Sequence, residues 1–216
     1  MIDTNHHFDR KWDLPEGRVI ECKTCGFVHA DPIPTKVELE EYYKIKYYNS
    51  IKPFDYGSVT DEVVANTLEH ILQSQWYSDI YNKVNTILTG NIRHTPNRPL
   101  KMVDIGCGND LLAKVFQTKG WNSSVIEPNK EAAEYLKKFG LTVYEQFADE
   151  MDEIAELKDL SFVNISFVLE HIRDPIDLLQ KVYHSLAPGG IIRICVPNDF
   201  STGQMAYRHF FNEKTH

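Results

Sequence analysis

The chain has 216 residues, enough for one sizeable core and a small additional unit. Its formal net charge of -8 at pH 7 argues against a nucleic-acid partner, because proteins that bind a phosphate backbone usually present a basic face. No apolar run approaches the roughly 20 residues of a membrane span, and the N-terminus lacks a signal-like apolar core. We therefore expect a cytoplasmic protein without a membrane or nucleic-acid partner.

The N-terminal segment differs from the rest in its aromatic and proline content. We expect residues 1–58 to form a small appendage and residues 59–216 to form the main domain. Within the appendage, residues 19–31 predict a strand, a tight turn that holds Cys22 and Cys25 in a CxxC spacing, and a second strand. The cysteines of the chain do not form the framework of a secreted disulfide-rich protein.

Two helices are predicted before the main alternating region. Thr35 and Glu38 have the spacing of a capping box and would begin the first helix. Thr60 or Asp61 can cap a long amphipathic segment whose apolar residues recur at helical spacing and which Gly90 ends. Its apolar stripe is interpreted mainly as core packing.

A glycine-containing turn dominates the middle of the sequence. Apolar residues run up to Asp104, Gly106 and Gly108 follow, and Asn109 and Asp110 then stand before a helical pattern. Glycines allow the backbone to take positive φ and a ligand to lie against the main chain. Free N–H groups at the start of the next helix attract an anionic group, so the stretch predicts a strand, a nucleotide-binding turn and a helix.

The next predicted strand ends in Glu127, about twenty residues after the turn, where a carboxylate can accept hydrogen bonds from two ribose hydroxyls. Together, the turn and Glu127 predict a ligand made of adenosine and an anionic tail.

Strands and helices are predicted to alternate through the main domain, which implies a doubly wound, mostly parallel, Rossmann-like α/β sheet with helices on both faces. The expected strands are 100–105, 123–127, 141–145, 161–168 and 190–196, and the expected helices are 110–119, 130–139, 149–157 and 175–186. Asp174 and Pro175 fit the cap and first turn of the last helix.

The motifs of this region resemble those of class I S-adenosylmethionine-dependent methyltransferases from about residue 59 to 200. The dinucleotide pattern GxGxxG fails at Leu111, and the methyltransferase pattern DxGxGxG fails at Asp110. Three further features favour the methyltransferases. Asp104 ends the first strand, where this family usually carries an acid. The segment FVNISFVLEHIRD resembles the fourth strand of the family with its loop, and the segment LAPGGIIRICVPN resembles the fifth-strand hairpin.

The resemblance implies a set of residues around S-adenosylmethionine. The expected cofactor-binding residues are Asp104, Gly106, Cys107, Gly108, Asn109, Glu127, Pro128, Phe147, Ala148, Ser166 and Phe167. Asp110 is expected to turn outward as a helix cap, because its carboxylate would repel the carboxylate of the donor.

Glu170 and His171 follow the fourth strand, on the rim that would face the transferred methyl group. His171 aligns with a histidine that serves as general base in similar sugar C-methyltransferases, and Tyr48 or Tyr47 would assist by the same resemblance. The alternative is that Glu170 and His171 only brace their loop.

The CxxCG segment resembles the N-terminal part of a methyltransferase group that includes sugar C-methyltransferases, whose small zinc module has two CxxC pairs. This chain has one pair, Cys22 and Cys25, so bound zinc would need two more ligands. His6, His7 and His29 are the only nearby imidazoles. We favour a hairpin without metal, and zinc at Cys22 and Cys25 is the alternative.

The sequence thus predicts methyl transfer to a small-molecule acceptor, such as a sugar or another polar metabolite. One alternative is an inactive relative that still binds the cofactor, and an NAD-dependent oxidoreductase is disfavoured by Leu111 and the LEH segment. Class I methyltransferases normally end with a further helix and an antiparallel strand pair, so a sequence that ends soon after Pro197 is expected to be cut short there. The oligomeric state is not predicted.

Overall fold

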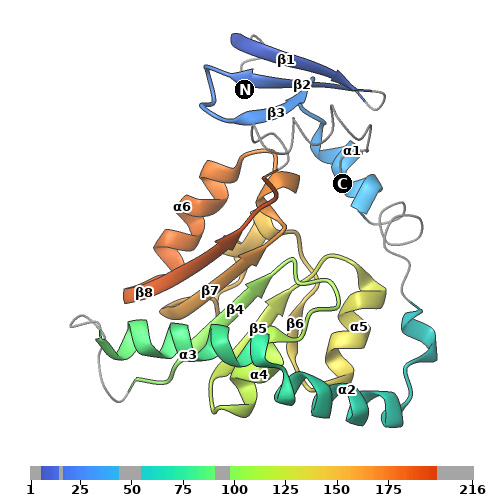
Figure 1. Ribbon diagram of the computed structural model, residues 1–216, viewed down its shortest axis with the longest axis vertical. Coiled ribbons are helices and arrows are strands. Elements are labelled where there is room, and N and C mark those ends of the chain that lie inside the picture. Colours follow the sequence, from blue (N-terminus) through green and yellow to red (C-terminus); the bar gives the residue numbers. More distant parts are fainter. Residues whose placement is uncertain (1–5, 15–16, 44–54, 91–97, 199–216) are drawn as a thin grey trace. The chain divides into compact units, whose positions relative to one another are not determined.

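The computed structural model describes residues 6–14, 17–43, 55–90 and 98–198 (Figure 1). The chain divides into two compact units, residues 1–42 with 197–216 and residues 43–196, and each is described by itself. The boundary expected after residue 58 stays a prediction.

The N-terminal unit contains a small antiparallel sheet with the strand order β1-β2-β3 (Figure 1). Its strands are β1 (Phe8–Leu14), β2 (Gly17–Cys22) and β3 (Val28–Asp31). The hairpin expected in residues 19–31 is confirmed as β2 and β3. Sequence analysis did not predict β1, because most of its side chains are exposed and Arg10 interrupts the apolar alternation of Phe8, Trp12 and Leu14.

Helix α1 (Lys36–Glu41) follows this sheet, and the capping box expected at its start is confirmed. The Glu38 N–H donates to Thr35 Oγ1 at 3.2 Å, and the Thr35 N–H donates to Glu38 Oε2 at 2.7 Å. These two hydrogen bonds satisfy backbone donors that the first helical turn leaves without partners.

The main unit is built on a parallel five-stranded sheet with the order β6-β5-β4-β7-β8 (Figure 1). Its strands are β4 (Lys101–Ile105), β5 (Asn122–Ile126), β6 (Thr142–Tyr144), β7 (Leu160–Ser166) and β8 (Leu186–Cys195). The expected alternation of strands and helices is confirmed, and the strand order reverses beside β4, where ligands bind in sheets of this kind.

Helices cover both faces of this sheet. Helices α3 (Gln75–Gly90), α4 (Leu112–Thr118) and α5 (Lys130–Lys138) share one apolar core with Met102 and Phe162. The 3-10 helix η3 (Ala148–Glu153) and helix α6 (Pro175–Ser185) share another core with Val103 and Ile165. Alternate residues of each strand therefore face different helical layers.

Three predicted elements differ from the structure. The long amphipathic segment is two helices, α2 (Asp61–Gln73) and α3, because Ser74 between them has an extended backbone with ψ 121°. The weak helix expected at 149–157 is the 3-10 helix η3. The last strand begins at Leu186 rather than at residue 190, and the jump in pairing between Leu160 and Phe162 marks a bulge in β8 instead of a hairpin.

Side chains cap the helices of the main unit as the sequence indicated. Thr60 accepts a hydrogen bond from the Val63 N–H at the start of α2, and Asp174 accepts one from the Asp177 N–H at the start of α6. Pro175 occupies the first turn of α6, where a missing N–H costs nothing. These signals are local, which is why sequence analysis placed them correctly.

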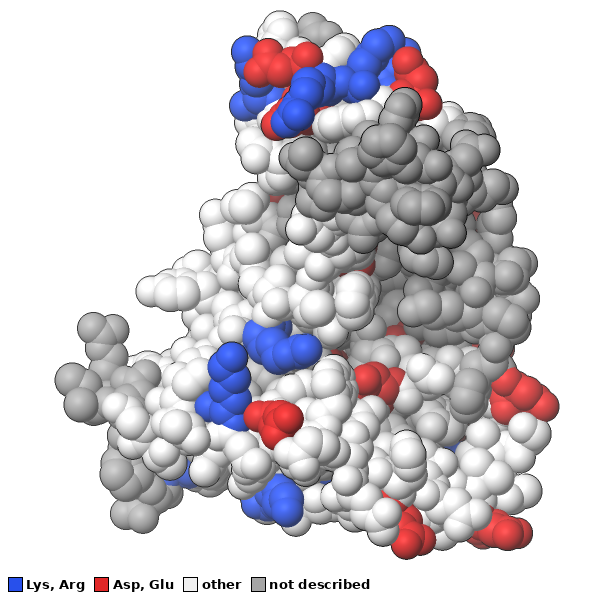
Figure 2. All heavy atoms as spheres, in the orientation of Figure 1, with Lys and Arg blue, Asp and Glu red and all other residues white. Residues whose placement is uncertain are grey.

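Within the described residues, no helix combines the length and the apolar character of a membrane-spanning segment. On the face drawn in Figure 2, basic and acidic side chains of the N-terminal sheet lie side by side. Ion pairs among the described residues of this sheet include Arg10–Glu21, Lys11–Asp13, Arg18–Asp13, Arg18–Asp31 and Lys23–Asp9. Its positive charges are therefore balanced by neighbouring carboxylates.

Candidate functional site

The turn after β4 has the backbone conformation that its glycines predict. Gly106 and Gly108 have φ angles of 64° and 59°. A Cβ atom on Gly106 would lie 2.7 Å from Cγ2 of Val168, so this position has no room for a side chain. The Gly106 N–H donates to the carbonyl of Ile126 at 2.7 Å, which ties the turn to the end of β5.

Glu127 connects the turns that follow β4 and β5. Its Oε2 accepts a hydrogen bond from the Gly108 N–H at 2.8 Å, and its Oε1 accepts one from the Asn129 N–H at 2.9 Å. Only 1% of Glu127 is exposed. The residue predicted to bind a ribose therefore also holds the glycine turn in place, a structural role that sequence analysis did not assign to it.

A row of polar side chains crosses three neighbouring strands on the face covered by α3. Asp104, Asn164 and Arg193 pair in register on β4, β7 and β8. Asn164 Nδ2 donates to Asp104 Oδ1 at 2.6 Å, and Arg193 donates to Asn164 Oδ1 at 2.7 Å. Asp104 Oδ2 is buried and has no hydrogen-bond partner among the described residues. Burial and the nearby Asp110 carboxylate raise the pKa of Asp104 well above its usual value.

Asp110 does not turn outward, so that expectation is wrong. Its Oδ1 accepts a hydrogen bond from the Leu112 N–H at 2.7 Å, but the N-cap of α4 is Leu111. The Asp110 side chain is half-buried and is also hydrogen-bonded to Tyr77 of α3. Burial raises the pKa of Asp110. Polar partners on α3 and on the backbone hold this carboxylate inside the molecule.

The remaining candidates of the turn region differ in their surroundings. Asn109 is exposed, while Pro128 is half-buried after β5. Burial and the carboxylates of Asp104 and Glu127 raise the pKa of the Cys107 thiol, which favours its protonated form.

The candidates after β6 and β7 lie at the same edge of the sheet, because parallel strands end together there. Phe147 immediately precedes η3, and Ala148 is buried at its first position. Ser166 ends β7, and Phe167 follows with a φ of 57° and 54% of its surface exposed. The Phe167 N–H donates to the Cys195 carbonyl at 2.8 Å, so it continues the pairing of β7 with β8.

Glu170 and His171 belong to the short 3-10 helix η4 (Leu169–His171) after β7. His171 Nε2 lies 3.8 Å from Glu170 Oε1, and the ring of Tyr43 packs edge-on against the His171 ring at a centroid distance of 5.2 Å. Tyr48 and Tyr47 lie outside the described residues. Among the described tyrosines, Tyr43 contacts the His171 ring.

Sequence analysis missed four polar residues of this region: Asn164, Arg193, Tyr56 and Tyr77. Burial and the Glu127 carboxylate raise the pKa of Tyr56, which comes from the 3-10 helix η2 (Tyr56–Ser58). A polar residue within each of the otherwise apolar strands FVNIS and IIRIC was a signal that could have identified Asn164 and Arg193. No such signal pointed to the tyrosines.

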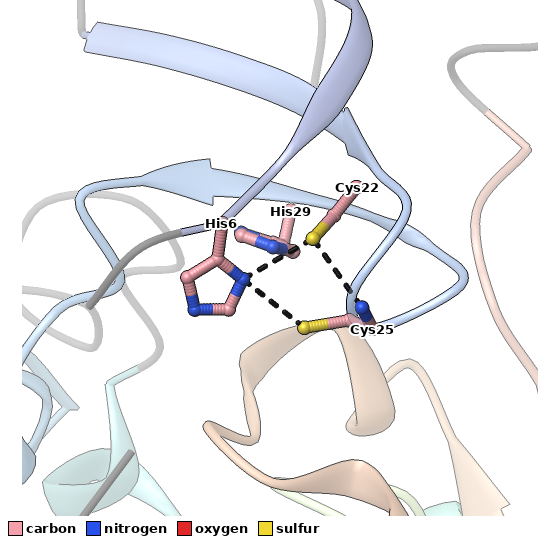
Figure 3. A group of neighbouring side chains, drawn as sticks. All are labelled: His6, Cys22, Cys25 and His29. Atoms are coloured by element: carbon pink, nitrogen blue, oxygen red, sulfur yellow. Dashed lines mark hydrogen bonds between the residues drawn. The ribbon is translucent and has the colours of Figure 1, made fainter. Parts of the chain in front are cut away.

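In the N-terminal unit, Cys22 and Cys25 lie together with His6 and His29 (Figure 3). His7 is exposed, and its N–H donates to Thr24 Oγ1 at 3.3 Å. Of the three nearby histidines, His6 and His29 thus lie beside the cysteine pair, and His7 does not.

Comparison with known proteins gives one family and several distant relatives. The family described as methyltransferase domain matches residues 78–216. A ubiquinone biosynthesis O-methyltransferase of Caulobacter sp. (strain K31) is 31% identical over 114 residues, which are 50% of this chain and 45% of that protein. One from Methylococcus capsulatus is 28% identical over 104 residues, 46% of this chain and 44% of that protein. The matched part is thus less than half the length of these two relatives.

The solved structure of a SAM-dependent methyltransferase from Archaeoglobus fulgidus is 19% identical to this chain. The alignment has a TM-score of 0.48 and covers 65% of this chain and 61% of that one.

Proposed function

The chain belongs to the family of methyltransferase domains, and from this premise we propose that it transfers a methyl group from S-adenosylmethionine to a small-molecule acceptor. The observation that carries the proposal is the edge of the sheet where the glycine turn, Asp104 and Glu127 come together.

The residues at this edge fit such a donor. Gly106 and Gly108 leave the turn after β4 without side chains, so a ligand can lie against its backbone. Asp104 Oδ2 is a buried acceptor without a partner among the described residues, which suits the ammonium group of a methionine moiety. Glu127 provides a carboxylate at the end of β5, which suits the hydroxyls of a ribose.

Asp110 repels the carboxylate of a bound S-adenosylmethionine less strongly than its formal charge implies. Burial raises its pKa, and hydrogen bonds from the Leu112 N–H and from Tyr77 are directed to it. A carboxylate that already has these partners repels a second anion less than a bare one would.

S-adenosylmethionine, when bound, supplies an activated methyl group together with its own leaving group. The chain has to align the acceptor, keep water out and take up the proton that the acceptor loses as its bond to the methyl carbon forms and the carbon–sulfur bond breaks. We propose that His171 is the general base that accepts this proton. Its imidazole lies against Tyr43 and close to Glu170. A neighbouring carboxylate stabilises the imidazolium that results.

We further propose that the acceptor atom is a hydroxyl oxygen of a polar metabolite. The two curated relatives are O-methyltransferases by name, and a hydroxyl carries the proton that a base such as His171 would remove. A sugar hydroxyl and a phenol both meet this description.

Titration calorimetry with S-adenosylmethionine, S-adenosylhomocysteine and NAD tests the donor. We expect both sulfur compounds to bind, NAD not to bind, and Glu127→Gln to weaken binding. Glu131→Gln, an exposed glutamate at the start of α5, is the matched control for a lost charge. Because Glu127 also holds the glycine turn, thermal unfolding of each variant must accompany the titration.

Binding of NAD alone would overturn the donor assignment. Donor binding without formation of S-adenosylhomocysteine, across a panel of sugars and phenols, would favour an inactive relative over an enzyme.

A further inference from the structure

We propose that His6, Cys22, Cys25 and His29 form a zinc-binding site in the N-terminal unit. One ligand atom from each of these residues lies within 4.8 Å of the others (Figure 3). His6 precedes β1, the two cysteines flank the turn after β2, and His29 lies in β3. A bound ion would therefore join all three strands of the sheet.

The spacing of the donors suits a small tetrahedral ion. His6 Nδ1 lies 3.1 Å from Cys22 Sγ and 3.3 Å from Cys25 Sγ. With usual zinc–sulfur and zinc–nitrogen bond lengths, ligand atoms of a tetrahedral site are about 3.4 to 3.8 Å apart. The donor atoms lie within 4.8 Å of one another, so side-chain movements of about 1 Å would complete that geometry.

His29 has a tautomer suited to coordination. Its Nδ1 lies 2.7 Å from the Ala30 carbonyl oxygen, which can only accept, so Nδ1 carries the proton. The lone pair is then on Nε2, which is buried and makes no well-formed hydrogen bond with the described residues, although the Cys22 thiol is close enough to interact with the His29 ring. A buried acceptor of this kind indicates a ligand that the polypeptide does not provide. The carbonyl bond is the outer contact that commonly orients a metal-binding histidine.

The cysteine turn has a backbone that supports thiolate ligands. The Cys25 N–H donates to Cys22 Sγ at 3.3 Å, and the Gly26 N–H donates to the Cys22 carbonyl at 2.9 Å. A backbone donor directed at the sulfur stabilises its negative charge.

The charges also balance. Each thiol loses its proton on coordination, and the two thiolates then neutralise the divalent ion while both imidazoles stay neutral. The site would therefore be uncharged and release two protons to solvent as it forms.

The unit needs such a cross-link because its own core is very small. Ile20 and Cys22 are the buried apolar residues among the described part of this unit. Its ion pairs are largely exposed, and exposed pairs contribute little to stability. Domains of this size usually depend on disulfides or metals.

The experiment uses the full chain without an affinity tag of histidines, purified in the absence of chelators. Elemental analysis measures zinc per chain, and Co²⁺ titration of chelator-treated protein reports the ligand set through its visible absorption. Cys25→Ser and His29→Ala test the ligands. His7→Ala and Cys195→Ser are matched controls, because these residues lie outside the cluster.

We expect one zinc per chain in the wild type and in both controls, loss of the metal in Cys25→Ser and His29→Ala, and a tetrahedral cobalt spectrum with thiolate charge-transfer bands. Wild-type protein with no more metal than Cys25→Ser and no such spectrum would overturn the site. An unchanged cobalt spectrum and affinity in His29→Ala would overturn the assignment of His29.

Discussion

Asn164 donates a hydrogen bond of 2.6 Å to Oδ1 of Asp104 across β4 and β7, while the other oxygen of that carboxylate is buried without a partner in the described part of the chain. A carboxylate in this situation is costly to ionise, and its pKa is raised accordingly. The proposed donor site therefore includes a group that destabilises the ligand-free protein and would be relieved by a cationic ligand.

Asp104→Asn should stabilise the ligand-free protein as pH rises while weakening donor binding. The folded-state pKa lies above the unfolded value, so the folded state retains a proton that the unfolded chain has lost, and stability falls with rising pH in that interval. Asparagine does not titrate, so this pH-dependent decrease in stability is absent in the variant. Thermal unfolding between pH 5 and 8, with the exposed Asp79→Asn as control, measures this effect. A variant that is less stable than the wild type throughout would contradict the argument.

Gly106→Ala should destabilise the protein more than Gly120→Ala. Both glycines have positive φ, so each alanine incurs backbone strain of about 1 to 2 kcal/mol. Only at position 106 would the new Cβ meet Val168, which adds about 1 to 3 kcal/mol of overpacking. Denaturant unfolding compares the two variants.

Adding Val168→Ala to Gly106→Ala should recover part of the difference, since the two side chains are in direct contact. Equal destabilisation by Gly106→Ala and Gly120→Ala would show that Val168 does not restrict this turn.

Arg193→Met should make stability fall more steeply with pH. Arg193 holds Asn164 by a hydrogen bond of 2.7 Å, and its positive charge lowers the pKa values of Asp104 and Asp110. Without the Arg193 charge, the pKa values of Asp104 and Asp110 rise further. The free energy of unfolding then goes on falling to a higher pH than in the wild type. Unfolding midpoints at pH 5 and pH 8 provide the measurement. Loss of the hydrogen bond alone would cost about the same at both values, roughly 1 kcal/mol.

His171→Asn should slow methyl transfer about 10²- to 10⁴-fold if the imidazole is the general base, while donor affinity is retained. Tyr43→Phe keeps the ring contact with His171 and should leave the rate nearly unchanged. The rate of S-adenosylhomocysteine formation, measured against pH with a hydroxyl acceptor, tests this: the wild-type rate should fall as the imidazole becomes protonated. A small loss of rate with an unchanged pH profile would mean that His171 only braces its loop.

The sequence by itself determined the features that depend on near neighbours in the chain. Alternating strands and helices, the capping box at Thr35, the cap at Asp174 and the positive φ of Gly106 each follow from residue types a few positions apart. The parallel orientation of the strands also followed, because strands that alternate with helices through short loops are joined by crossover connections.

Only the tertiary structure decided which distant side chains meet. The register of β4, β7 and β8 puts Asp104, Asn164 and Arg193 in one row, and a shift of one residue would have turned each to the opposite face. The pairing of the N-terminal strands likewise brings His6 and His29 to Cys22 and Cys25, while the adjacent His7 stays outside. Register is fixed by packing over the whole sheet, so local propensity does not reveal it.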